Sequence, residues 1–262
     1  MQKFVLLTQE ARLDDGRIVK RIMAVRDFGN VKKGDLGGFV EWTNNLSQDG
    51  LCWIADGATV AGWSRVFGDA QLKDRALCDG FVSVSDRAVI GDDAHLKGHV
   101  AVYGDAKIGL YSYLTDGVVV RDHATIFCHC RYSNSGKTWI PNLSEQATVC
   151  GNATLKGRIS MSGTSTATDH ATLRDNARLR ENSYAGGTSI IEGQATLEGN
   201  AGVSQQARIS GQSKLAGNVL ATGHSVVSGK SLLLCNVVVS GHAVVCNETL
   251  SGEQFRSERV KE

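Results

Sequence analysis

Six of the seven histidines in this 262-residue chain occupy one equivalent position, directly before a small residue, in a repeat that spans most of the sequence. An imidazole can take a proton from a hydroxyl or an amine near neutral pH, so each could act as a general base. The same position elsewhere holds Asn, Asp or Gln, and all these residue types tolerate the positive φ of a tight corner. A structural role at a corner therefore remains the alternative for each histidine. The six are His99, His123, His129, His170, His224 and His242.

Two short clusters resemble ligand sites but fit other roles better. Cys128, His129 and Cys130 carry metal-binding groups, yet the repeat points Cys130 inward and leaves the other two on a corner. Three ligands so placed do not converge on one ion, so we predict structural thiols and no metal. Residues 135–138 (SGKT) resemble the end of a phosphate-binding loop, but Arg131 stands where that loop requires glycine. We therefore expect no nucleotide site there.

The repeat that positions these residues has a period of six. Each hexad contains a small residue, a spacer and a larger apolar residue, as in Ala195 and Leu197. Thirteen hexads cover residues 58–130, and eighteen more, in a frame shifted by one, cover residues 147–249. A period of six fits neither a helix nor a plain strand, so the repeat must define the architecture itself.

Residues separated by one spacer lie on the same side of a strand, so both repeat residues of a hexad face inward. The hexad also supplies a two-residue corner, often Gly followed by a polar residue, as at Gly68-Asp69 and Gly199-Asn200. Three strands and three corners make a triangular coil of eighteen residues. Coils then stack at about the 4.8 Å spacing of paired strands. The sequence thus predicts an all-β parallel solenoid of roughly ten coils.

This pattern resembles the hexapeptide-repeat superfamily, whose fold is a single-stranded left-handed parallel β-helix. Residues 33–41 (KGDLGGFVE) and 45–47 (NLS) resemble the head of the enterobacterial YdcK-like acetyltransferases and their prophage relatives. The resemblance implies left-handed winding and transfer of an acetyl group from acetyl-CoA, held in a groove between coils. One departure is that glycine stands at the corner, whereas many active members carry it directly after the aliphatic residue.

Three segments lie outside the regular β-helix of residues 46–251. Residues 1–45 contain two predicted strands joined at Asp14-Asp15-Gly16, and we expect this β-hairpin to cap the open first coil. Residues 131–146 interrupt the helix one residue short of a full coil, as either a defective coil or an extruded loop. Residues 252–262 form a charged C-terminal tail.

The interruption decides which histidines we favour as catalytic residues. In hexapeptide acyltransferases an extruded loop often walls the active site, so the resemblance implies that His123 and His129, beside residues 131–146, are the candidates for the base. Trp139 would then line the pocket. A histidine on a uniform stretch of corners has no such wall to exclude water.

An apolar collar is predicted near the C-terminal end of the repeat. The spacer between the two inward residues should face solvent, and in six consecutive hexads it is Leu or Val. A continuous apolar surface is unusual on a monomer, so we expect a second subunit in a dimer or trimer, the tail or a partner to bury it. The collar residues are Leu220, Val226, Leu232, Val238, Val244 and Leu250.

The composition of the chain limits the binding partners and the cellular compartment that we expect. A net charge of +1 gives no argument for a nucleic-acid or membrane surface. The apolar run at residues 4–7 is too short for a signal peptide or a membrane span. Seven cysteines without a pattern fit free thiols in a reducing compartment better than a disulfide framework. We therefore predict a cytoplasmic protein with neither a nucleic-acid nor a membrane partner.

Two functions remain open from the sequence. One is an acyl-CoA-dependent acyltransferase, in which a histidine is the base, acetyl-CoA is the co-substrate and a small hydroxyl or amine is the acceptor. The alternative is a non-catalytic β-helical scaffold for binding or assembly, with a prophage as one source. Neither the acceptor nor the acyl group is defined by the sequence.

Overall fold

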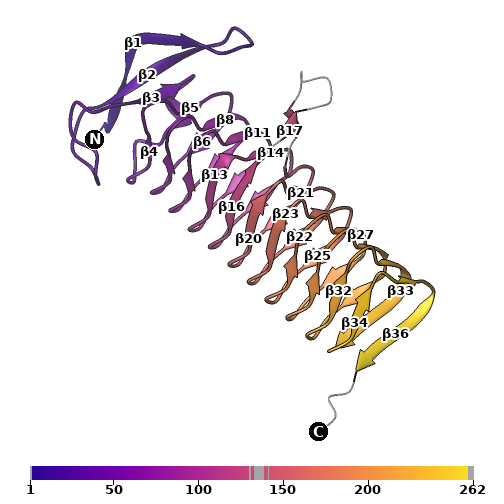
Figure 1. Ribbon diagram of the computed structural model, residues 1–262. Coiled ribbons are helices and arrows are strands. Elements are labelled where there is room, and N and C mark those ends of the chain that lie inside the picture. Colours follow the sequence, from indigo (N-terminus) through magenta and orange to yellow (C-terminus); the bar gives the residue numbers. More distant parts are fainter. Residues whose placement is uncertain (1, 130, 133–138, 141, 259–262) are drawn as a thin grey trace. The chain divides into compact units, whose positions relative to one another are not determined.

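The chain folds into two compact units, Met1–His123 and Ala124–Glu262, which we call unit 1 and unit 2. The structure is a computed structural model that describes residues 2–129, 131–132, 139–140 and 142–258. Both units consist of short β-strands stacked in coils, as Figure 1 shows. Within the described ranges there is no α-helix, and the short 3-10 turn η1 spans Thr43–Asn45. The predicted all-β parallel solenoid is confirmed.

Unit 1 begins with a hairpin and continues as parallel coils. Strand β2 pairs antiparallel with both β1 and β3, and β3 pairs parallel with β5, so β3 joins the hairpin to the coils. The sheet orders within this unit are β1-β2-β3-β5-β8-β11-β14, β4-β7-β10-β13 and β6-β9-β12-β15. The strands are β1 (Phe4–Arg12), β2 (Ile18–Ala24), β3 (Leu36–Val40), β4 (Trp53–Ile54), β5 (Thr59–Val60), β6 (Arg65–Val66), β7 (Gln71–Leu72), β8 (Leu77–Gly80), β9 (Ser83–Val84), β10 (Val89–Ile90), β11 (His95–Gly98), β12 (Ala101–Val102), β13 (Lys107–Tyr111), β14 (Tyr113–Thr115) and β15 (Val119–Val120).

Unit 2 repeats the same three-sheet plan and ends in longer strands. Its sheet orders are β16-β20-β23-β26-β29-β32-β34, β19-β22-β25-β28-β31-β33 and β21-β24-β27-β30-β33, so β33 runs through two sheets. Strands β17 and β18 form a separate antiparallel hairpin. The strands are β16 (Thr125–His129), β17 (Arg131–Tyr132), β18 (Trp139–Ile140), β19 (Thr148–Val149), β20 (Thr154–Gly157), β21 (Ser160–Met161), β22 (Thr166–Ala167), β23 (Thr172–Asp175), β24 (Arg178–Leu179), β25 (Tyr184–Ala185), β26 (Ile190–Ile191), β27 (Thr196–Gly199), β28 (Gly202–Val203), β29 (Arg208–Ile209), β30 (Lys214–Gly217), β31 (Leu220–Ala221), β32 (Val226–Ser228), β33 (Leu232–Gly241), β34 (Val244–Cys246), β35 (Thr249–Leu250) and β36 (Glu253–Glu258).

The core of each unit is a column of alternating small and large residues. Ala195 and Leu197 are fully buried, and so are the equivalent residues of nearly every hexad. The predicted inward pair is therefore confirmed. Because the small residue leaves room at the edge of the triangle and the large one fills its centre, three short strands close around a packed interior.

Corner geometry corrects one expectation about the histidines. The left-handed conformation belongs to the residue before the histidine, as at Gly98 (φ 74°) before His99 and Asp122 (φ 65°) before His123. None of the histidines in the described residues has a positive φ. The expectation that a positive φ accounts for histidine at this corner position is therefore wrong. Asp residues with this backbone conformation also bond to the next coil, as Asp86 accepts the N–H of Gly104 and Asp169, before His170, accepts the N–H of Gly187.

Corner side chains instead form ladders from coil to coil. Asn182, Asn200, Asn218 and Asn236 are linked by amide hydrogen bonds of 2.9–3.0 Å. The rings of His224 and His242 stack with centroids 4.8 Å apart, as their spacing of eighteen residues predicted. The corner position thus selects side chains that bond or stack with their own equivalents.

The interruption is an extruded hairpin followed by an early return to the coil. Strand β17 pairs antiparallel with β18, with Tyr132 opposite Trp139. Leu143 is already buried and bridges to Met161, so the coil has resumed at that point. The buried Asn142 amide donates to the carbonyl oxygens of His129 (3.2 Å) and Ile159 (3.0 Å), which ties the two ends of the excursion to the next coil. Residues 130, 133–138 and 141 lie outside the described residues.

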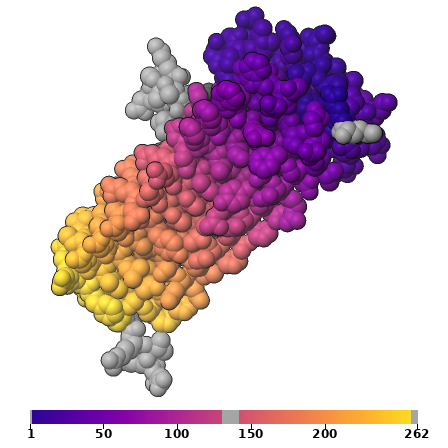
Figure 2. Space-filling view, turned by 180° about the vertical axis from the view of Figure 1, so that it is seen from behind, coloured from indigo at the N-terminus to yellow at the C-terminus, as the bar shows by residue number. Residues whose placement is uncertain are grey.

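The open first coil of unit 1 is closed by the N-terminal residues. Lys3 is fully buried, and its Nζ donates to the carbonyl oxygens of Cys52 (3.0 Å), Asp49 (3.2 Å) and Gly50 (3.4 Å). These carbonyls have no preceding coil to bond them, so the ammonium group satisfies acceptors that would otherwise be buried and unpaired. Figure 2 shows the indigo hairpin residues against the violet residues of the first coils.

The collar near the C-terminal end of unit 2 is partly as predicted. Leu220 and Val244 are exposed, and Val226, Leu232 and Val238 are half-buried, so these five face outward. The assignment of Leu250 is wrong, because it faces inward and is only 4% exposed. Leu250 pairs with Leu233 and Thr249 with Leu232, so the spacing there is seventeen residues and the side chains shift by one position. Tail residues Glu253–Glu258 form β36, which pairs with β33.

Buried hydroxyls in the small inward position give a test of this core. The Oγ atom of Ser189 is buried without a hydrogen-bond partner among the described residues, whereas the equally buried Ser213 Oγ donates to the Ser210 carbonyl at 2.8 Å. We expect Ser189→Ala to raise the free energy of unfolding by about 1 kcal/mol and Ser213→Ala to lower it by about the same amount. The melting temperature should shift in the same directions. Thermal unfolding followed by circular dichroism measures both, and equal losses in the two variants would contradict the assignment.

Candidate functional site

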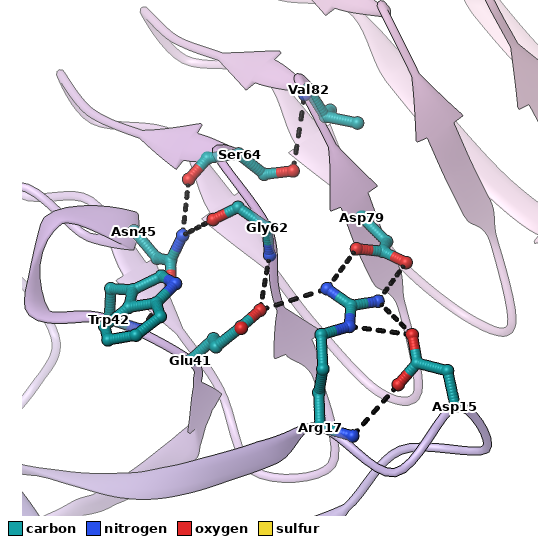
Figure 3. A network of polar contacts seen from close by, with 9 residues as sticks. All are labelled: Asp15, Arg17, Glu41, Trp42, Asn45, Gly62, Ser64, Asp79 and Val82. Carbon is teal, nitrogen blue, oxygen red and sulfur yellow. Dashed lines mark hydrogen bonds and ion pairs between the residues drawn. The ribbon is translucent and has the colours of Figure 1, made fainter.

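A groove of about 900 Å³ opens in unit 1 where the turn of the hairpin meets the first coils. It combines two exposed indoles with a network of charged and amide side chains, part of which Figure 3 shows. Enclosed space with a few converging polar groups is the usual form of a ligand site. The lining residues are Arg17, Glu41, Trp42, Thr43, Asn44, Asn45, Gly62, Trp63, Ser64, Arg65, Asp79 and Gly80.

Arg17 at the centre of the network is saturated by carboxylates. Its Nη1 and Nη2 donate to the two oxygens of Asp79 at 2.9 and 2.7 Å, in the bidentate geometry that suits a guanidinium. Nη1 also donates to Glu41 Oε2 at 3.0 Å and Nε to Asp15 Oδ2 at 2.7 Å. Hydrogen bonds to Asp79 and then Asp15 raise the pKa of Arg17, and Arg17 in turn lowers the pKa of Asp15. The network fixes the hairpin turn on the coils.

The floor of the groove is held by backbone contacts. Glu41 Oε2 accepts the N–H of Gly62 at 2.8 Å, and the Asn45 amide donates to the carbonyl oxygens of Gly62 (3.0 Å) and Ser64 (2.8 Å). The Asn45 oxygen accepts the N–H of Trp42 at 2.7 Å. These bonds complete the irregular first coil, in which residues 43–45 form η1 in place of a strand. Trp42 is thereby placed on a rigid turn.

The two tryptophans of the groove are among the most exposed large side chains of the chain. Trp42 is 60% exposed and Trp63 is 77% exposed. Trp63 occupies the same corner position as Phe81 and His99, one and two coils further on, and the rings of Phe81 and His99 stack with centroids 4.6 Å apart. The spacing of eighteen residues from Trp63 to Phe81 to His99 was a signal for this aromatic corner. Sequence reasoning about histidines alone missed it, along with Arg17 and Trp42.

The structure brings His123 next to a carboxylate. His123 Nδ1 lies 3.4 Å from Asp105 Oδ2, and both oxygens of Asp105 also accept hydrogen bonds from Arg87 at 2.6 Å. Hydrogen bonding to Arg87 lowers the pKa of Asp105, so this carboxylate is ionised near neutral pH. The His123 side chain is 63% exposed. A carboxylate against one imidazole nitrogen leaves the other as a proton acceptor, which is the geometry of an oriented base.

The second candidate, His129, lies in a different unit. It ends β16 in unit 2, is exposed, and precedes the hairpin of β17 and β18, whereas His123 closes unit 1. Trp139 is part of β18, and its side chain lies outside the described residues. The predicted pocket of His123, His129 and Trp139 therefore stays a prediction.

His95, the histidine outside the corner position, has an environment that sequence reasoning did not consider. It lies in β11 on a flat sheet face, half-buried, with its ring edge-to-face with Tyr113 at 6.4 Å between centroids. Burial lowers the pKa of His95, while nearby Asp93 opposes this shift. The side chain is therefore neutral near pH 7. Its spacer position between Ala94 and Leu96 predicts a side chain facing solvent, so its partial burial was not signalled by the sequence.

The Cys-His-Cys cluster is not arranged as the repeat predicted. Cys128 is buried, not on a corner, because β16 extends past the usual two-residue strand and points Cys128 inward. Burial raises the pKa of Cys128 to about 12. Cys130 lies outside the described residues. Over the described ranges, no group of three or more His, Cys, Asp or Glu residues is placed to hold a metal ion.

Comparison with known proteins finds a similarity to a protein that is described as an acetyltransferase. No family model matches the chain. The chain is similar to the protein called uncharacterized acetyltransferase YdcK of Escherichia coli (strain K12), with 34% identity over 62 residues, or 21% of this chain. The matched part spans only 19% of the length of that relative. Together with the parallel coils, this match confirms the predicted resemblance to hexapeptide-repeat proteins of the YdcK type. Separately, no helix among the described residues is long and apolar enough to cross a membrane.

Thiol labelling tests the burial of the cysteines. Cys235 and Cys246 are exposed, whereas Cys52, Cys78, Cys128 and Cys150 are buried. Because the thiolate is the reactive form and burial raises the pKa of Cys128 and Cys78, iodoacetamide at pH 8 should label the first two and spare the other four. Peptide mass spectrometry gives the pattern, with urea-unfolded protein as the fully labelled control. Rapid labelling of Cys128 in the folded protein would contradict its inward position.

Proposed function

We propose that the protein is an acyltransferase of the hexapeptide-repeat type, which transfers the acetyl group of acetyl-CoA to a small hydroxyl or amine acceptor. The observation that carries the proposal is the contact of His123 Nδ1 with Asp105 Oδ2 at 3.4 Å. The similarity to a protein described as an acetyltransferase supports the class of reaction. We place the base at His123, and His129 is the second candidate.

In the proposed reaction His123 acts as a general base. Asp105 holds the Nδ1–H side of the ring, and Nε2 accepts the proton of the acceptor hydroxyl or amine as its oxygen or nitrogen attacks the thioester carbonyl. The carbon–sulfur bond then breaks, and the departing coenzyme A sulfur takes the proton back from the imidazolium. Arg87 keeps Asp105 ionised, so the carboxylate also stabilises the imidazolium while it exists.

The surroundings of His123 fit an anionic acyl donor. Lys107 is exposed and lies close enough to lower the pKa of Asp105. Its ammonium group can attract the phosphates of coenzyme A, whereas Arg87 and Arg121 are paired with Asp105 and Asp122. The His123–Asp105 pair orients the proton transfer, and the exposed face of His123 provides no enclosure by itself.

Substitution of the two histidines tests the base. His123→Ala should lower turnover with acetyl-CoA by about 10²–10⁴-fold, because that is the usual contribution of a general base. Stability should change little, since the side chain is mostly exposed. Release of free coenzyme A across a panel of small alcohols and amines gives the rate. The matched control is His170→Ala, an exposed histidine at the equivalent corner position in unit 2.

Three outcomes separate the parts of this proposal. If wild-type protein does not bind acetyl-CoA at millimolar concentration by calorimetry, the acyltransferase proposal fails. If His129→Ala loses turnover and His123→Ala does not, the base is His129. If both variants turn over normally while acetyl-CoA binds, neither histidine is the base.

A scaffold function is favoured by a different observation, the apolar outer surface at the end of unit 2. Leu220, Val238 and Phe255 lie in register on adjacent strands, and Phe255 is 67% exposed. Val244 adds a further exposed side chain on the neighbouring sheet. Apolar surface of this extent is typical of a contact with another protein. We propose that it forms the interface of a dimer or trimer.

Charge substitution tests this interface. Changing both Val238 and Val244 to Lys should dissociate the oligomer, because a buried unpaired charge is costly at an interface. Sedimentation velocity at micromolar concentration reports the assembly, and Val119→Lys, a half-buried outward valine in unit 1, is the control. An oligomer unchanged in the double variant would exclude this surface. A wild-type monomer would exclude self-association and leave the tail or a different protein as the covering partner.

A further inference from the structure

We infer that the groove of unit 1 between Trp42 and Trp63 is a binding site for an uncharged oligosaccharide. The site is separate from the proposed acyl transfer, because neither His123 nor Asp105 is among its lining residues. The inference depends on three properties of the groove, namely its aromatic faces, its polar groups and its charge balance.

The aromatic faces are the first property. Trp42 and Trp63 border the same groove and remain 60% and 77% exposed, although an indole is a large apolar group that is more often buried. The C–H faces of a pyranose ring are apolar, whereas its rim carries hydroxyls, so a sugar can cover an indole and keep its hydroxyls bonded. Trp42 and Trp63 therefore offer two such apolar faces beside one groove.

The polar groups suit hydroxyls, which both donate and accept hydrogen bonds. Both bonds that Glu41 makes among the described residues use Oε2, which leaves Oε1 free to accept from a ligand. Asn44 is exposed on η1 next to Trp42 and offers an amide with both a donor and an acceptor. These groups lie on the rigid turn described above, so ordering them on binding costs little entropy.

The charge balance argues against a phosphate or another polyanion. The lining residues carry two formal positive charges, on Arg17 and Arg65, and two negative ones, on Glu41 and Asp79, and Asp15 adds a further negative charge beside Arg17. All the guanidinium nitrogens of Arg17 already bond to carboxylates, so they are not available to an anion. A neutral ligand pays no electrostatic penalty here, and a volume of about 900 Å³ accommodates a few sugar units.

Binding of defined oligosaccharides tests the inference. We would screen wild-type protein on an array of uncharged glycans that includes cello-, malto- and chito-oligosaccharides, and measure the best binder by calorimetry. Trp63→Ala and Trp42→Ala should each weaken binding by about tenfold, because loss of one aromatic stacking contact has that order of effect. Phe67→Ala, an exposed aromatic at another corner of unit 1 and outside the groove, should leave the affinity unchanged.

The outcomes are distinguishable from those for acyl transfer. Affinity should hold between low and high salt, since the ligand is neutral, and acetyl-CoA binding should be unaffected in both tryptophan variants. The inference is overturned if no uncharged glycan on the array binds, or if binding persists fully in both Trp63→Ala and Trp42→Ala. Loss of acetyl-CoA binding in these variants would instead assign the groove to the acyl donor and also overturn it. Melting temperatures of all variants establish that they are folded.

Discussion

The structure depends on one constraint, the register of eighteen residues between coils. In the regular coils, alternate strand N–H groups bond to carbonyls seventeen residues on, as from Thr154 to Ala171 and from Thr172 to Ser189, both at 2.9 Å. A residue added within a strand would exchange the core and surface positions that follow it in that strand. Extra chain must therefore leave the coil, as the β17–β18 hairpin does, or the frame must shift, as it does before Leu250. The buried Asn142 shows the cost of an excursion, because a side-chain amide has to bond carbonyls on both sides of it.

The same register decides where chemistry can occur. Equivalent residues lie above one another, so a corner residue contacts residues one coil before and after it. This explains why Asp105 lies between Arg87 and His123, and why His99 stacks on Phe81. Such ladders orient side chains well, but a uniform corner is convex and open to water. Enclosure arises where the repeat stops. In unit 1 that place is the junction of the hairpin and the first coils, where Arg17 binds Asp79 across 62 positions of sequence.

The core could be predicted from the sequence because its residues recur with a fixed period. The junction of the hairpin and the first coils could not be predicted, because its contacts join residues that follow no period. Ala195 and Leu197 could be placed inside by counting, and His224 could be stacked on His242 by the same count. Leu250 was misplaced because a shift of one residue near the end leaves no trace in the residue types. Cys128 was misplaced because β16 continues beyond the length that the hexad implies. Lys3 and Arg17 could not be assigned, since their partners are distant carbonyls and carboxylates that depend on how the hairpin folds over the coils.

Recognition and proton transfer have different requirements, and in unit 1 they are met at different corners. His123 has the carboxylate partner that a base needs, but its side chain is 63% exposed. The groove has enclosure and two indoles, but its lining includes no histidine, and Arg17 binds the carboxylates of Glu41 and Asp79. A carboxylate held by a guanidinium is a weak base, because its proton affinity is lowered. The groove is therefore suited to hold a ligand and not to activate one, whereas His123 is suited to activate an acceptor that other contacts must hold.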